Sequence, residues 1–234
     1  MHMAVPVLRF ALAIALAAPT FALGESFCGV ALRAAGMAPG PGVSTDPDDE
    51  IDSGSLWLAD LNALRSTRIT GAGYHSPVFT PAADAILAIR DDRIVRIPIA
   101  GDDRQEREVY RLDNILKLVG FLPDGRLLLA SDDGTTLQVG LLTIDQGKVQ
   151  WLTPNADSPG DRAALERIRG WDRVYGPFRV TTERLAFGEK EWTEVVLEEA
   201  GKAAQAISDC QGVLCGQAAL APQKRLVVFV RSQP

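Results

Sequence analysis

The chain has 234 residues, with 24 Lys and Arg against 30 Asp and Glu and a formal net charge of −6. This length suits one domain or two small ones. Because contacts to phosphates dominate affinity for nucleic acids, an acidic chain without a basic patch argues against a nucleic-acid partner.

Residues 1–24 are typical of a secretory signal peptide. Arg9 precedes an apolar run over residues 10–18, and small residues follow at 22–24, where a signal peptidase would cleave. The run is shorter than the ~20 apolar residues that span a bilayer. We therefore expect a periplasmic or secreted protein with no stable membrane span after removal of this leader, with an uncleaved anchor as the alternative.

Residues 25–52 are predicted to be an N-terminal segment and a linker. Gly and Pro are frequent over residues 36–42, and the acids that follow are Asp46, Asp48, Asp49, Glu50 and Asp52. Carboxylates of this kind are Ca²⁺ ligands, but the spacing lacks the Gly and the terminal Glu of an EF-hand loop. We expect a solvated linker and no cofactor, with Ca²⁺ binding as the alternative.

Short strand-like segments follow in quick succession after the linker. They are rich in branched or aromatic residues and are bounded by Gly, Pro, Asp or Asn, a pattern that predicts an all-β sandwich, barrel or propeller. They cover residues 56–61, 67–70, 86–89, 94–99, 127–130, 137–144, 149–152, 185–187, 195–197 and 226–230.

An internal repeat selects the propeller. Phe79 and Phe121 lie 42 residues apart in similar segments, and Phe178 and Leu220 are again 42 apart. A period in the low forties is the length of one four-stranded propeller blade. The longer gap between Phe121 and Phe178 leaves room for an insertion of 15 residues. Its residues 159–169 read as one short helix, with Ser158 as the N-cap and Gly170 at the end.

The two chain ends each supply half a blade. The last repeat stops after two strands, and residues 56–61 and 67–70 are two strands without a preceding pair. Pairing these halves would close the ring and remove an exposed sheet edge. We therefore predict a small propeller over residues 53–234, with about four antiparallel blades and N-to-C closure. Five blades are the alternative.

Three segments carry a resemblance to a known family. Residues 55–61 read SLWLADL, residues 77–81 read PVFTP and residues 121–127 read FLPDGRL. They resemble the WD-like repeats of the TolB propeller family, well over residues 53–153 and more loosely over 171–234. The resemblance implies an exported binding module, because the propeller of that family commonly serves contacts between proteins.

The cysteines are Cys28, Cys210 and Cys215. An oxidising compartment favours a disulfide. Pairing Cys210 with Cys215 would staple a short loop, whereas pairing Cys28 with either would tie the chain ends together. No histidine or cysteine spacing indicates a metal site.

The histidine supply limits the possible chemistry. His2 lies in the leader, which leaves His75 as the one histidine of the mature chain. There is no Gly-x-Ser-x-Gly nucleophile motif and no glycine-rich phosphate loop. We therefore favour binding over catalysis. The alternative is a small carbohydrate-active hydrolase or lyase that uses carboxylates at the channel mouth, with Asp91/Asp92, Asp132/Asp133 and Glu189/Glu191 as candidates.

Those acids recur at one position of the repeat, in the turn between the second and third strands. In a propeller, such turns lie on the same face as the loops that lead into the innermost strands. We therefore predict one partner-binding face that combines acidic turns with aromatic and polar residues. Its members are Tyr74, His75, Asp91, Asp92, Asn114, Asp132, Asp133, Trp171, Arg173 and Tyr175. Aromatic and arginine side chains are frequent energetic centres of interfaces, and the expected partner is a protein or peptide.

Overall fold

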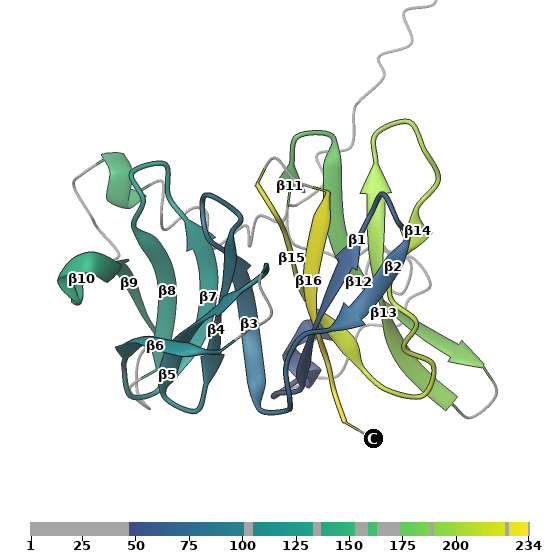
Figure 1. The fold of residues 1–234 in the computed structure, drawn as a ribbon, viewed down its shortest axis with the longest axis horizontal. Coiled ribbons are helices and arrows are strands. Elements are labelled where there is room, and N and C mark those ends of the chain that lie inside the picture. The colour runs from purple at the N-terminus through teal and green to yellow at the C-terminus, as the bar shows by residue number, and fades with distance from the viewer. Residues whose placement is uncertain are drawn as a thin grey trace, which may run out of the picture.

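A computed structural model describes residues 47–100, 105–132, 137–152, 159–162, 174–187, 190–222 and 225–233. Within this part of the chain, the strands form four antiparallel sheets of four strands each. Figure 1 shows these sheets side by side, two on the left of the view and two on the right. The predicted all-β propeller with four blades is confirmed.

Three blades are each built from four consecutive strands, and the fourth combines strands from two distant stretches of the chain. The first three blades are β3 (Tyr74–Phe79), β4 (Ala85–Arg90), β5 (Arg93–Pro98) and β6 (Arg107–Arg111); β7 (Ile115–Phe121), β8 (Leu127–Asp132), β9 (Leu137–Thr143) and β10 (Lys148–Leu152); and β11 (Val174–Tyr175), β12 (Phe178–Phe187), β13 (Lys190–Glu199) and β14 (Gln205–Ala206). The fourth joins β15 (Cys215–Leu220) and β16 (Leu226–Arg231) to β1 (Ser55–Asp60) and β2 (Arg65–Arg68).

The N-to-C closure occurs as predicted. β1 pairs with β16 in antiparallel register from Ser55 opposite Arg231 to Asp60 opposite Leu226. At the start of this pairing, a Cβ on Gly54 would lie 2.1 Å from the carbonyl oxygen of Arg231, so this close approach requires glycine. The pairing turns the two chain ends into one blade and removes two strand edges.

Buried apolar clusters join neighbouring blades. One contains Leu56, Val228 and Val230 of the closing blade together with Phe79 and Ile86 of the next. A second joins the closing blade to β12 and β13, and a third joins the β3–β6 sheet to the β7–β10 sheet. Central strands read as continuous apolar runs because they are covered on both faces, as β4 shows with five buried residues in succession.

The innermost strands were the hardest to recognise in the sequence. β3, β7 and β15 each carry a register shift against the second strand of their blade. In β3 and β15 the shift coincides with a left-handed residue, Ser76 with φ 50° and Gln217 with φ 49°. A bulge of this kind breaks the alternation of apolar and polar residues and turns one side chain in a new direction.

Three other expectations need correction. The strand predicted at 185–187 is the end of the ten-residue strand β12, and the strand predicted at 67–70 lies at Arg65–Arg68. The end of the predicted solvated linker is solvated only in part. Residues Pro47–Glu50 form a 3₁₀ helix, η1, in which Asp48 is buried and Glu50 is exposed. Ile51 after it is buried, and Asp52 is exposed. Residues 159–162 are helical, as expected, whereas Ser158 and residues 163–170 lie outside the described part.

Candidate partner-binding face

One face of the propeller collects the starts of the innermost strands, and we call it the front face. Tyr74 at the start of β3 pairs with Arg90 at the end of β4 and with Gly54 before β1. Cys215 at the start of β15 pairs with Arg231 at the end of β16. The C-terminal end marked in Figure 1 lies on this face. Loops from different blades therefore converge here on a rigid scaffold, the usual position of binding loops.

Most of the described residues predicted for this face lie on it. His75 follows Tyr74 in β3, Asp91 and Asp92 form the turn between β4 and β5, and Asn114 directly precedes β7. Asp91, Asp92 and Asn114 are exposed, whereas His75 is half-buried.

In the second blade, the backbone of Asp132 ends β8 at the front face. The third blade departs from the prediction. Tyr175 instead ends β11 and pairs with Phe178, at the opposite end of the blade from the turn after Phe187. Its predicted place on the front face is therefore wrong, because β11 runs away from this face. Asp133, Trp171 and Arg173 lie outside the described residues.

Tyr74 does not present its ring to a partner. It is 6% exposed, and its hydroxyl donates to Glu106 while it accepts from Arg90 at 3.2 Å. The Arg90 guanidinium also lies 5.3 Å from the centre of the ring and pairs with Glu106 at 2.6 Å. Burial, followed by the hydrogen bond to Glu106, raises the pKa of Tyr74 to about 12. The predicted aromatic anchor is thus a buried brace between β3, β4 and the segment before β6.

His75 follows Tyr74 of this brace in β3. Its Nδ1 is 3.4 Å from the hydroxyl of Ser76. Burial lowers the pKa of His75 from its ordinary value of 6.5, and the nearby carboxylate of Asp52 opposes that shift. The ring therefore favours the neutral form, in which one nitrogen donates and the other accepts.

The rim of the face is mixed in charge. Asp91, with φ 52°, sits in the left-handed conformation that the two-residue turn requires, and Arg93 donates to it at 2.9 Å. On the neighbouring strand β6, Arg111 pairs with Glu108 of the same strand at 3.3 Å. The predicted acidic turns are therefore accompanied by arginines, which gives the rim both signs of charge.

The centre of the front face is occupied by a polar cluster that we call the central hub: Asp48, Ser76, Thr182 and Gln217. The carboxylate of Asp48 accepts from the Thr182 hydroxyl at 2.5 Å and from the backbone N–H of Gln217 at 2.7 Å. The side chain of Gln217 in turn accepts from the backbone N–H of Ser76 at 2.7 Å. The hub thereby joins three blades to η1.

Further contacts fix the hub to the segment before β1. The amide nitrogen of Gln217 donates to the carbonyl oxygens of Ile51 and Asp48. A Cβ on Gly216 would lie 2.4 Å from the Asp48 carboxylate, so β15 and η1 are packed without spare room. No spacing signal marks this cluster in the sequence, because it consists of a lone Gln in an Ala-rich strand and of one Asp among five acids.

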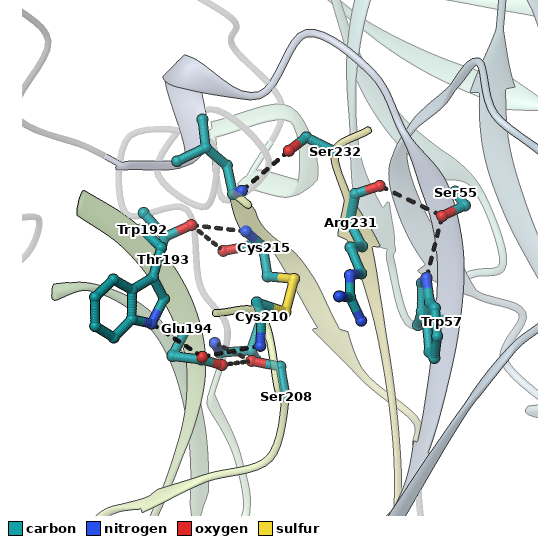
Figure 2. Close-up of a disulfide and its surroundings, with 12 residues drawn as sticks. Ser55, Trp57, Trp192, Thr193, Glu194, Ser208, Cys210, Cys215, Arg231 and Ser232 are labelled. Carbon is teal, nitrogen blue, oxygen red and sulfur yellow. Dashed lines mark hydrogen bonds between the residues drawn. A yellow bond between two sulfur atoms is a disulfide. The ribbon is translucent and has the colours of Figure 1, made fainter. Parts of the chain in front are cut away.

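The disulfide lies where the chain leads into β15. Cys210 is bonded to Cys215, which decides between the pairings that the sequence left open; Cys28 lies outside the described residues. Figure 2 shows how β13 supports both cysteines. The Thr193 hydroxyl donates to the Cys215 carbonyl and accepts from its N–H, both at 2.7 Å, and the Glu194 carboxylate accepts from the Cys210 N–H at 2.9 Å.

The described residues hold no group of three or more His, Cys, Asp and Glu side chains placed to bind a metal ion. Of the carboxylate candidates in the third blade, Glu191 is exposed in β13, and Glu189 lies outside the described part. In a search of the same residues for a helix long and apolar enough to cross a membrane, none was found.

Comparison with known proteins gives fold neighbours alone. No family model matches the chain, and no curated protein matches it. Among solved structures, the chain is similar to the protein assigned as TolB in Agrobacterium tumefaciens, with 13% identity and a TM-score of 0.47 over 78% of this chain and 98% of that one. It is also similar to TolB from Acinetobacter baumannii, with 16% identity and a TM-score of 0.36 over 76% of this chain and 49% of that one. These neighbours are proteins of the family that the sequence repeats resemble.

Proposed function

We propose that this chain is an exported, non-catalytic propeller that binds a protein or peptide partner through its front face, in the cell envelope or outside the cell. The observation that carries the proposal is the convergence of exposed loops from separate blades around a centre held by the hub. The leader-like residues 1–24 and the disulfide support the compartment, because disulfides persist in oxidising surroundings.

The chemistry of the face suits recognition of a partner. Asp92 and Asn114 are exposed on short connections whose backbones are fixed by neighbouring strands. A preformed surface avoids much of the entropy cost of ordering loops on binding. The mixed rim of carboxylates and guanidinium groups supplies charge complementarity, which sets specificity and association rate more than it sets affinity.

A pair of matched charge reversals tests this assignment. Asp92 and Asp145 are both exposed aspartates in turns between strands, and they lie on opposite faces of the propeller. Each would be changed to Arg, and the purified variants used to recover partners from an extract of the cell envelope. We expect Asp92→Arg to reduce recovery of a saturable partner several-fold and Asp145→Arg to leave it unchanged. Equal recovery by both variants would refute the assignment of the front face.

A further inference from the structure

Three side chains near the front-face end of the closing blade form a group that we call the cationic corner: Trp57 of β1, Arg68 of β2 and Arg231 of β16. In the antiparallel ladder, Trp57 is paired with Arg68 on one side and with Phe229 on the other, and Arg231 lies two residues beyond Phe229. Directly paired residues share a face of the sheet, as do residues two apart on one strand. The three side chains therefore lie on one face of the closing blade, the face toward β12 and β13.

Trp57 and Arg231 are in direct contact. The Arg231 guanidinium lies 5.0 Å from the centre of the Trp57 ring, within the range of a cation–π interaction. The indole N–H donates to the Ser55 hydroxyl at 3.1 Å, and the ring packs against the buried cluster between the closing blade and β12 and β13. Figure 2 shows Arg231 between this ring and the disulfide. Trp57 is half-buried, so the ring is fixed in place and part of it is accessible to a partner.

Arg68 supplies a second cation beside the ring. It is exposed, and its Nε donates to the Thr70 carbonyl at 2.7 Å, which orients the terminal nitrogens of the guanidinium. Neighbouring strands lie about 4.8 Å apart and residues rise about 3.4 Å along a strand, so the backbones of Arg68 and Arg231 are roughly 12 Å apart with Trp57 between them. A partner segment that lies over Trp57 can therefore present one acidic side chain to each guanidinium.

The cationic corner differs in its charge balance from other arginines of the propeller. Arg90 and Arg96, for example, contact carboxylates at 2.6 and 2.7 Å. Within the part of the chain that the structure describes, no carboxylate oxygen lies within 4.0 Å of a guanidinium nitrogen of Arg68 or Arg231. Two guanidinium groups beside an indole therefore form a local positive surface on a chain whose net charge is −6.

We propose that the cationic corner binds an acidic segment of a partner protein, in which two carboxylates pair with Arg68 and Arg231 and an apolar side chain between them lies against Trp57. Guanidinium groups and carboxylates form bidentate, charge-assisted hydrogen bonds, and Trp and Arg are enriched at the energetic centres of interfaces. The proposal rests on the binding function proposed above, and it names the chemistry of the partner segment that the closing blade recognises at the front face.

The charge of the surrounding surface favours an acidic peptide over an anionic membrane. Recognition of anionic lipids typically uses clusters of about four to eight Lys and Arg side chains, whereas the cationic corner has two arginines. A flat bilayer on the front face would also meet the exposed carboxylate of Asp92. A short peptide avoids that repulsion, because it contacts the closing blade alone.

The test uses the synthetic peptide Ser-Thr-Glu-Leu-Glu-Thr-Ser with an uncharged fluorescent label, and measures its binding to the full chain by fluorescence anisotropy at low ionic strength, where screening is weak. We expect Arg231→Gln to weaken binding at least about tenfold and Arg68→Gln to weaken it several-fold, since each change removes a charge-assisted pair. Arg65→Gln is the matched control and should leave binding unchanged. It removes the same charge from an exposed arginine at the other end of β2, where Arg65 is paired with Asp60 in the ladder.

A second peptide, Ser-Thr-Gln-Leu-Gln-Thr-Ser, separates recognition of carboxylates from apolar adhesion and should bind at least about tenfold more weakly. Because Arg68 is exposed, Arg68→Gln keeps the test valid if Arg231→Gln lowers the stability of the fold. Equal binding of the two peptides, equal effects of Arg65→Gln and Arg68→Gln, or no saturable binding up to about 1 mM would overturn the proposal. Tighter binding to vesicles of anionic lipid than to the acidic peptide would overturn it as well.

A failure of this proposal is distinguishable from a failure of the front-face assignment. Loss of partner recovery with Asp92→Arg, together with unchanged peptide binding by Arg68→Gln and Arg231→Gln, would overturn the cionic pairing proposed for the closing blade and leave the front-face assignment intact. Equal partner recovery with Asp92→Arg and Asp145→Arg, together with weakened peptide binding by Arg68→Gln, would refute the front-face assignment and support the cationic corner.

Discussion

Replacement of Gln217 by Ala tests whether the central hub holds the propeller together. The change removes a bond to the backbone N–H of Ser76 and bonds to the carbonyls of Ile51 and Asp48. Ser76 and Ile51 are 5% and 3% exposed, so their backbone groups would lose a partner in a largely dry site. With a net value of about 1 kcal/mol for each well-formed bond and about 1–3 kcal/mol for a group left unpaired, we expect a loss of about 2–4 kcal/mol in the free energy of unfolding.

The measurement is urea unfolding followed by tryptophan fluorescence, with the slope of the transition checked for two-state behaviour. Gln150→Ala is a matched control, because Gln150 also accepts from one side chain, Arg126 at 3.0 Å, and donates to another, Asp161 at 3.2 Å, but is exposed. We expect its effect to stay within about 0.5 kcal/mol. If Gln217→Ala changed the stability no more than Gln150→Ala, the hub would not be a structural joint and this reasoning would be refuted.

Three further outcomes follow from the same structure. Gly216→Ala should lower the free energy of unfolding in urea by about 1–3 kcal/mol, because its Cβ would meet the Asp48 carboxylate at 2.4 Å. Gly71→Ala is the control and should be nearly neutral, since a Cβ there would have no atom within 4 Å. Equal effects of the two changes would contradict the tight packing of η1 on β15. Joint replacement of Cys210 and Cys215 by Ser should lower stability by about 2 kcal/mol through the loss of a short loop closure, yet leave the chain folded, since Thr193 and Glu194 still hold the loop; a thermal scan with and without reductant measures this, and an unfolded double variant would disprove it. The folded chain binds a proton at His75 less readily than the unfolded chain, because the pKa of His75 is lowered on folding. The contribution of His75 to the free energy of unfolding is therefore fully present above pH 6.5 and declines as the pH falls through the lowered pKa, and the profile should be flatter in His75→Gln. An unchanged dependence of the free energy of unfolding on pH below 6.5 in that variant would exclude His75 as its source.

The sequence by itself determined the class of fold and the scheme of its closure. The 42-residue spacing of Phe79 and Phe121 and the half-blades at the two ends were sufficient, because a four-stranded blade has a characteristic length and an unpaired half-blade must find a partner. The placement of Asp91, Asp92 and Asn114 on one face followed from strand direction alone, since equivalent connections of a propeller share a face.

Tertiary structure decided what each of these side chains does. Tyr74 is adjacent to exposed turns in the sequence, but Glu106 and Arg90 hold it buried, and nothing in the spacing of these residues predicts that they meet. Asp48 looks like one acid in a solvated run until Thr182 and the backbone of Gln217, both more than 130 residues away, converge on it. The repeat period is local and survives in the sequence. The hub depends on contacts between blades, which exist only once the closing blade has brought the two ends of the chain together.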